Sequence, residues 1–153
     1  MSYDLMVFNP NSPPSDRKGF INWYDNQTSW SESHNYNNPD VTTPELRAWF
    51  MEMIKQYPAM NGPFATDDID NPKMSDYSVG KSIIYVAFAW SQAESAYHAV
   101  FNLAKKHNIG FFDVSTSNGE VWVPDQKGEY ICMHGGDDTQ RKTGKWWKFG
   151  NKR

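Results

Sequence analysis

The sequence predicts an α+β or α/β fold, and one stretch of the chain carries most of the evidence. Residues 82–90 form a nearly continuous apolar run, SIIYVAFAW, and residues 109–115 form a second one, IGFFDVS. Between them, residues 91–108 have the apolar spacing of an amphipathic helix. A strand, a helix and a strand with almost no linker are typical of a βαβ-type unit.

The first part of the chain predicts a strand, a helix and a loop. The apolar segment 3–8, YDLMVF, indicates a strand, and an Asn- and Pro-rich turn separates it from a helix over about 13–30. Ser12 or Ser15 suits the N-cap position of that helix. Residues 31–41 show no periodicity, so we expect a loop there.

A second helix is predicted over residues 44–57. Thr43, with Pro44 directly after it, is typical of a helix start, and Pro58 marks the end because proline cannot continue a helix. Six apolar side chains recur at a helical spacing and form a single face. They are Leu46, Trp49, Phe50, Met53, Ile54 and Tyr57. A second long loop, residues 59–75, follows.

The third helix has capping signals at both of its ends. Ser91 and Glu94 match a capping box at the start. Lys105 and Lys106 lie in the last turn, where cations suit the helix dipole.

Short strands are predicted after the βαβ-type unit. Residues 117–119, SNG, are typical of a hairpin turn, and the alternating segment 120–123, EVWV, suits the antiparallel partner. Residues 130–133, YICM, are compatible with one more short strand.

The predicted order of elements is β-α-α-β-α-β-β. This order favours a small mixed sheet with helices packed mainly on one face. A chain of 153 residues suits one domain, to which we assign residues 1–140. Residues 141–153 are assigned to a basic, aromatic C-terminal tail.

Charge is divided unevenly along the chain. Residues 141–153 hold six basic residues and no acidic one, which leaves 9 basic and 18 acidic residues elsewhere, a net charge of −9. An acidic body favours basic partners and repels phosphate backbones. The tail segment 145–149, KWWKF, instead suits stacking on nucleic-acid bases. A nucleic-acid-binding module that works through the tail therefore remains an alternative.

The composition favours a cytoplasmic location. The single cysteine, Cys132, excludes an intramolecular disulfide and suits a reducing compartment. The first residues do not have the pattern of a signal peptide. The longest apolar run, residues 83–90, is far shorter than the roughly 20 residues of a membrane span.

No metal or cofactor is predicted. Residues 67–70, DDID, look like the start of a calcium loop, but Lys73 stands where such a loop needs glycine. Cys132 and His134, with the acidic residues 137–138, lack the second ligand pair of a zinc site. A Gly-rich phosphate loop is also missing from the sequence.

Two pairs of side chains are the candidates for catalysis. Glu94 and His98 are four residues apart on the predicted third helix, so they can touch and exchange a proton. Cys132 and His134 have the chemistry of a nucleophile and a base. Neither pair matches a catalytic signature, so a small hydrolase or nuclease stays an alternative to a binding protein.

Seven short stretches, spread over about residues 2–124, form a recognisable set. They are SYDLMVF (2–8), LRAWFMEM (46–53), NGP (61–63), DYS (76–78), FAWSQAESAY (88–97), GFFDVS (110–115) and VWVP (121–124). Together they resemble short, uncharacterised bacterial proteins that are associated with toxin–immunity loci. The resemblance implies a small, stable, non-catalytic protein and supplies no catalytic residues, and the basic tail departs from it.

We therefore expect a non-enzymatic bacterial binding protein, an immunity protein that neutralises a toxin domain by occluding it. An acidic body with exposed aromatic side chains suits fast, electrostatically steered binding of a basic toxin domain. The expected contact residues lie on two loops. They are Trp30, His34, Tyr36, Asp67, Asp68 and Asp70.

Overall fold

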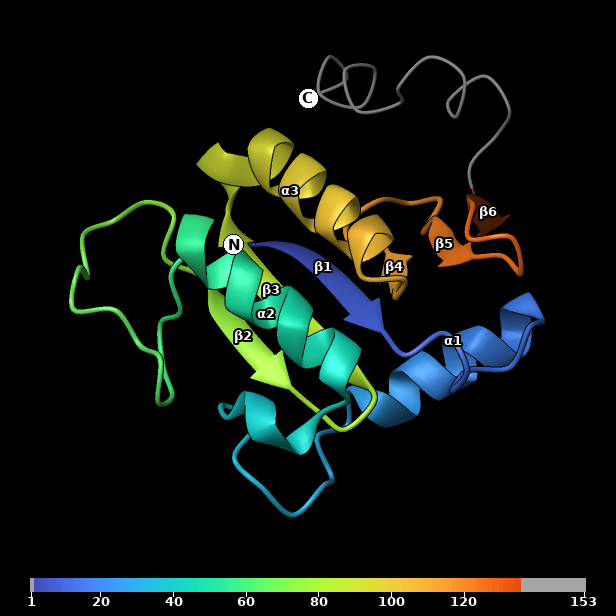
Figure 1. Cartoon of the computed structure of the whole chain (residues 1–153), viewed down its shortest axis with the longest axis horizontal. Coiled ribbons are helices and arrows are strands. Elements are labelled where there is room, and N and C mark those ends of the chain that lie inside the picture. Colours follow the sequence, from blue (N-terminus) through green and yellow to red (C-terminus); the bar gives the residue numbers. More distant parts are fainter. Residues whose placement is uncertain (1, 136–153) are drawn as a thin grey trace.

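A single sheet organises the chain in a computed structural model, which describes residues 2–135 (Figure 1). Its strand order is β2-β3-β1-β4-β5-β6, and every neighbouring pair is antiparallel. Residues 136–140 of the predicted domain and the predicted tail, 141–153, lie outside the described residues. The strands are β1 (Ser2–Phe8), β2 (Asp76–Val79), β3 (Ile83–Ala89), β4 (Gly110–Phe112), β5 (Val121–Pro124) and β6 (Tyr130–His134).

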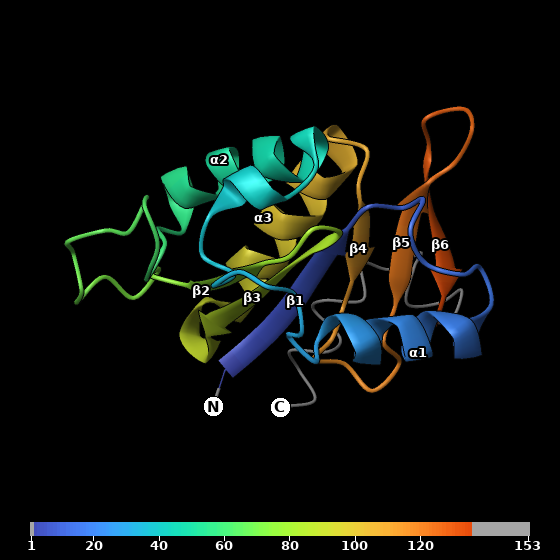
Figure 2. The same ribbon diagram turned by 90° about the horizontal axis from the view of Figure 1, so that it is seen from below.

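Helices lie on both faces of the sheet, with two of the three α-helices on one face. Figure 2 shows α2 and α3 on that face and α1 on the other. The predicted α+β class, the order of elements and the placement of helices mainly on one face are therefore confirmed. The predicted mixed sheet is wrong, because all the neighbouring strands described here are antiparallel. The helices are α1 (Arg17–Gln27), α2 (Pro44–Gln56) and α3 (Ala93–Lys106), with short 3-10 helices η1 (Pro39–Val41) and η2 (Trp90–Gln92).

The predicted strand-helix-strand unit is β3-α3-β4, and another strand lies between its two strands. Met6 of β1 pairs with Tyr85 of β3 on one side and with Phe112 of β4 on the other. Because β3 and β4 are both antiparallel to β1, they run parallel to each other, as a βαβ crossover requires. The first strand of the chain thus lies inside the sheet.

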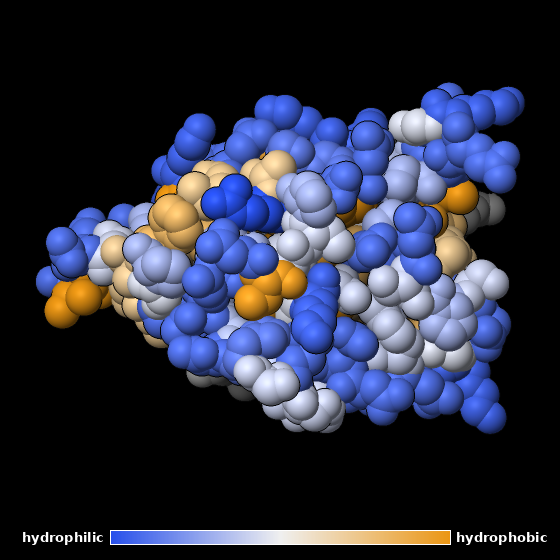
Figure 3. Space-filling view, turned by 60° about the horizontal axis from the view of Figure 1, so that its bottom comes forward, coloured by the Kyte–Doolittle hydropathy of each residue, from blue (hydrophilic) through white to orange (hydrophobic). Residues whose placement is uncertain are grey.

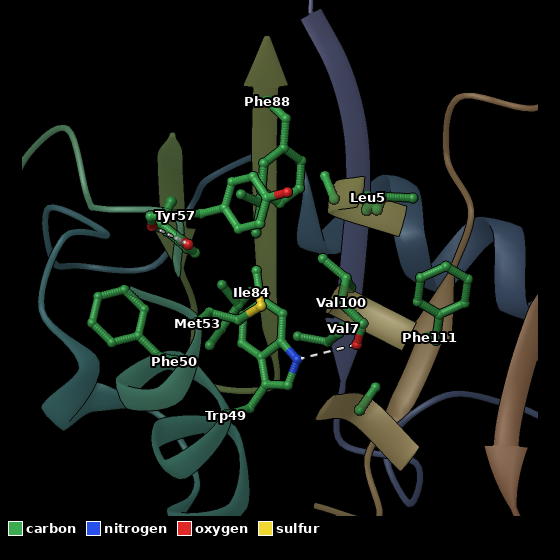
Figure 4. Close-up of a cluster of buried hydrophobic side chains, with 14 of the residues drawn as sticks. Leu5, Val7, Trp49, Phe50, Met53, Tyr57, Ile84, Phe88, Val100 and Phe111 are labelled. Atoms are coloured by element: carbon green, nitrogen blue, oxygen red, sulfur yellow. Dashed lines mark hydrogen bonds between the residues drawn. The ribbon is translucent and has the colours of Figure 1, made fainter. Parts of the chain in front are cut away.

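The larger hydrophobic cluster lies between the sheet and the pair α2 and α3 (Figure 4). Trp49 and Met53 of α2 are fully buried against Leu5 and Ile84 of the sheet. The indole Nε1 of Trp49 donates to the carbonyl oxygen of Val100 at 3.4 Å, which joins α2 to α3. Each aliphatic or aromatic side chain of this size contributes about 1.5–3 kcal/mol by its burial.

The smaller cluster lies between the sheet and α1. Phe20 is the fully buried residue of α1, and its ring meets Phe8 and Phe112 at centroid distances of 5.4 and 5.2 Å. Arg17 adds a hydrogen bond from Nη1 to the carbonyl oxygen of Gly119 at 2.8 Å. These contacts hold α1 over β1, β4 and β5.

The start of α1 differs from the prediction, whereas that of α2 agrees with it. The N-cap of α1 is Asp16, not Ser12 or Ser15, because the Asp16 carboxylate accepts from the Gly19 amide at 2.9 Å. The helix therefore covers residues 17–27 and not 13–30. By contrast, Thr43 caps α2 as predicted and accepts from the amide of Leu46 at 3.2 Å.

The predicted capping box of α3 does not form. Trp90, Ser91 and Gln92 make the 3-10 turn η2, so α3 begins at Ala93 with Gln92 at the N-cap and no side-chain cap bond. Ser91 is one position too early to cap the helix, and Glu94 is correspondingly in the second helical position. The capping-box geometry needs serine at the N-cap and glutamate at the third position.

β2 and β6 are the two edge strands of the sheet, and both are short. β2 has the sequence DYSV and an alternating burial pattern, and it is a strand that was not predicted from the sequence. β6 confirms the expected strand at YICM and extends to His134. The predicted turn between β4 and β5 is also confirmed, with Gly119 at a φ of 55°.

Within residues 2–135, we find no helix with both the length and the apolar character that a membrane crossing requires.

Candidate protein-binding surface

The loop between α2 and β2, residues 59–75, is fixed at its base by backbone hydrogen bonds. We call it the acidic loop. The Met60 amide donates to the Ser75 carbonyl at 2.9 Å, and the Ser75 amide donates to the Pro58 carbonyl at 2.8 Å. The Thr66 amide returns to the Ala59 carbonyl at 2.9 Å. The two ends of the loop are therefore tied together.

The outer part of the acidic loop is a series of tight turns. The hydroxyl of Thr66 accepts from the amide of Asp68 at 3.1 Å. The side-chain oxygen of Asn71 accepts from the amide of Lys73 at 2.9 Å, and its carbonyl accepts from Met74 at 3.0 Å. Asx and hydroxyl turns of this kind give a loop a defined shape without strand pairing. The acidic loop consequently presents its side chains in a set arrangement.

Apolar and acidic side chains are exposed together on the acidic loop. Figure 3 shows hydrophobic side chains beside hydrophilic ones at the left end of the molecule, over the loop between α2 and β2. Three of the five large apolar side chains exposed among residues 2–135 lie here, and Ile69 is the most exposed of them, at 74%. The loop's exposed side chains include Met60, Phe64, Asp67, Asp68, Ile69 and Asp70.

The loop of residues 30–36, which we call the aromatic loop, is held in place by Glu32. The Oε1 atom of Glu32 lies 2.5 Å from Nε2 of His34 and accepts from the amide of Lys81 at 3.0 Å. The amide of Val79 donates to the carbonyl of Tyr36 at 2.7 Å. These bonds attach the aromatic loop to the turn between β2 and β3.

Within the aromatic loop, the three predicted contact residues have different positions. Trp30 is exposed at 37%, with its ring 5.1 Å from that of Tyr36 and 6.0 Å from that of Tyr85. His34 and Tyr36 are half-buried, and their rings meet at 4.3 Å. Trp30 is therefore available to a partner, whereas His34 and Tyr36 shape the loop that presents it.

The acidic loop contacts the segment that directly follows the aromatic loop. Gly62 of the acidic loop has a φ of 87°, and a Cβ atom there would lie 2.2 Å from the carbonyl oxygen of Asn37. Only glycine permits this approach, since its φ is positive and the space for a side chain is filled. The acidic loop and the segment that follows the aromatic loop thus form adjoining parts of one surface.

The two candidate catalytic pairs lie on different elements, Glu94 and His98 on α3 and Cys132 and His134 on β6. Glu94 and His98 are both exposed on the outer face of α3. The thiol of Cys132 donates to the backbone carbonyl of His134 at 3.3 Å, while the His134 ring packs 6.1 Å from Phe20. Burial lowers the pKa of His134, and the nearby Arg17 guanidinium lowers it further.

Two buried carboxylates were not anticipated from the sequence. Asp113 and Glu120 face each other across the start of the β4–β5 hairpin and are 0% and 1% exposed. Oε1 of Glu120 accepts from the indole of Trp122 at 3.1 Å. The signal was present in the sequence, because each carboxylate directly adjoins a buried apolar strand.

Metal ligands do not gather in residues 2–135, where no group of three or more His, Cys, Asp or Glu side chains has the spacing to hold an ion. Asp137 and Asp138, the acidic residues considered beside Cys132, lie outside the described residues.

Comparison with known proteins gave no relative: no family model, no curated protein and no solved structure matches the chain.

Proposed function

We propose that this chain is a non-enzymatic bacterial binding protein, an immunity protein whose acidic loop docks onto a basic toxin domain and occludes it. The observation that carries the proposal is the gathering of exposed apolar and acidic side chains on one structured loop. Scattered apolar side chains are normal on a protein surface, but several on one short loop are typical of an interaction site.

The physical chemistry of the acidic loop suits tight binding. Asp67, Asp68 and Asp70 would steer a basic partner to the loop, because opposite charges raise the rate of encounter. Phe64 and Ile69 would then lose water-exposed apolar area in the contact, which supplies affinity. Since the loop is already ordered by its own hydrogen bonds, little conformational entropy is lost on docking.

The proposal includes a cytoplasmic location. A single cysteine suits a reducing compartment. Fractionation of cells of the source organism, followed by immunodetection of the untagged protein, tests this part separately.

Capture of the partner and measurement of its affinity test the function. The tagged protein is used to isolate binding proteins from lysate of the source organism, and each captured protein is purified and titrated by calorimetry over a salt series. We expect one basic protein whose affinity falls as salt rises, and whose toxicity in cells is relieved by this chain.

Charge reversal then assigns the surface. The triple variant Asp67→Lys, Asp68→Lys and Asp70→Lys should bind at least about 100-fold more weakly, since close interfacial charge pairs couple strongly. The matched control reverses three exposed acids outside the acidic loop and changes the net charge equally. It combines Asp25→Lys, Glu94→Lys and Glu129→Lys. Equal losses of affinity in both variants would show that net charge, and not the acidic loop, accounts for binding, and this would contradict the proposal.

A further inference from the structure

Among residues 2–135, no helix lies over one part of the sheet on the side that carries α1. Figure 2 shows α1 beneath β4, β5 and β6. The cluster under α1 also includes Ile83 and Tyr85 from the first half of β3, whereas β2, the second half of β3 and the first half of β1 lie outside it. Side chains of these three strands that point to this open face alternate with buried ones on the opposite face. All seven are exposed or half-buried. They are Ser2, Asp4, Asp76, Ser78, Tyr85, Ala87 and Ala89.

The strand register places a small side chain between two carboxylates on the open face. Ala87 of β3 is directly opposite Asp4 of β1 on one side and opposite Asp76 of β2 on the other. Neighbouring strands lie about 4.8 Å apart, so the Cα atoms of the two aspartates are roughly 10 Å apart. Ala87 carries only a methyl group, so it takes up little of the space between the two carboxylates.

Both carboxylates are held in place by neutral partners. Asp4 accepts from the hydroxyl of Ser2 at 2.6 Å and from the hydroxyl of Tyr85 at 2.5 Å. Asp76 accepts from the side-chain amide of Asn61 at 3.3 Å. A carboxylate has room for about four hydrogen bonds, so each retains acceptor capacity. The seven side chains of the open face include two acids and no base.

The open face is continuous with the surface proposed above. Asn61, which bonds to Asp76, belongs to the acidic loop. Trp30 of the aromatic loop packs 6.0 Å from Tyr85 and forms the opposite rim. A partner segment that leaves the acidic loop therefore meets Asp76 first, then Ala87, and then Asp4.

We propose that this open face binds a basic segment of the protein partner, with an arginine side chain seated over Ala87 between Asp4 and Asp76. Arginine fits better than lysine because its planar guanidinium donates in several directions and can bond to two carboxylates at once. Tyr85 and Trp30 add aromatic surface on which a guanidinium stacks favourably. This inference rests on the proposed function, of which it specifies the partner's chemistry.

A synthetic peptide of alternating arginine and serine tests the inference, with the full chain in calorimetry at low salt. Ala87→Lys puts an ammonium group between the carboxylates without removing any hydrogen bond of the face, and it should weaken binding about tenfold or more. Asp76→Asn should weaken it about fivefold. Asp25→Asn, an equal charge change on α1, should stay within about twofold of the wild type. The corresponding lysine–serine peptide should bind more weakly.

Several outcomes would overturn the inference. One is an unchanged affinity for the peptide in Ala87→Lys. If the lysine variant does not fold, Ala87→Leu fills the same space without a charge, and an unchanged affinity in that variant has the same meaning. Another is an equal loss in Asp25→Asn, which would indicate attraction by net charge alone. If the wild type binds the peptide only after deletion of residues 141–153, the chain's own basic segment is the occupant, and the assignment to a partner is wrong.

The two proposals fail in different ways. If the triple acidic-loop variant loses the captured partner while Ala87→Lys keeps both partner and peptide, the proposed function stands and the arginine site does not. If the peptide depends on Ala87 but no basic protein is captured, the open face binds arginine and the immunity role is wrong.

Discussion

Gly110 of β4 lies directly against the buried ring of Phe8 of β1. A Cβ atom at Gly110 would lie 2.2 Å from the Cζ atom of the Phe8 ring, which is fully buried and cannot move aside. We predict that Gly110→Ala lowers the free energy of unfolding by about 1–3 kcal/mol, as overpacking of a core does. Urea unfolding followed by circular dichroism measures this.

A second glycine is the control for that substitution. At Gly80 the nearest atom to an added Cβ is Oε2 of Glu32, at 3.4 Å. Gly80→Ala should therefore change the free energy of unfolding by less than about 0.5 kcal/mol. Similar values for both variants would mean that β4 and β1 are not packed as closely as described.

His134 should make stability depend on pH in the acid range. Burial and the nearby Arg17 lower the pKa of His134 below its ordinary value of 6.5. As pH falls through 6.5, the unfolded chain binds a proton that the folded chain does not, so the free energy of unfolding decreases. Above 6.5 both states are neutral and the effect vanishes. We predict that His134→Gln removes this decrease, measured as the difference in thermal midpoint between pH 7.5 and pH 5.

At the level of elements, the starts of α2 and α3 differ in how they are capped. Thr43→Ala removes the side-chain bond to the Leu46 amide and should cost about 1 kcal/mol of stability. Ser91→Ala should cost much less, because Ser91 lies inside η2 and caps nothing. Parallel urea titrations compare the two. A larger loss in Ser91→Ala would restore the capping box that the sequence suggested.

Local patterns predicted the elements well and their exact starts less well. The spacing of apolar residues identified α2, α3 and β3, since periodic burial is visible in the sequence. Asp16 was missed because several serines nearby have equal cap preferences, and only the backbone decides between them. β2 was missed although Asp76–Val79 alternates, because it directly follows the long stretch without periodicity at residues 59–75.

The sequence predicted part of the candidate site. The acids of the acidic loop were identified because they lie in a stretch without periodicity. The exposed Phe64 and Ile69 were not, because apolar residues are assigned to the core by default. The open face was beyond prediction, since Asp4, Asp76 and Ala87 are brought together only by the strand register.

At the scale of the whole molecule, β1 belongs to both hydrophobic clusters. Leu5 packs in the cluster under α2 and α3, and Met6 packs in the cluster under α1. Because one strand joins the clusters, we predict a single cooperative unfolding transition. Met53→Ala and Phe20→Ala, one in each cluster, should each lower that transition by about 2–5 kcal/mol. Coincident curves from tryptophan fluorescence and circular dichroism are the check, and two separate transitions would contradict it.

The central position of β1 also matters while the protein is being made. The ribosome completes β1 first, but its partner β3 begins 75 residues after Phe8, and β4 comes later still. At a synthesis rate of about 5–20 residues per second, β1 waits roughly 4–15 s without a strand beside it. During that time the apolar sequence YDLMVF is exposed in the nascent chain. The sheet can therefore begin to form only after β3, in the middle of the chain, has been synthesised.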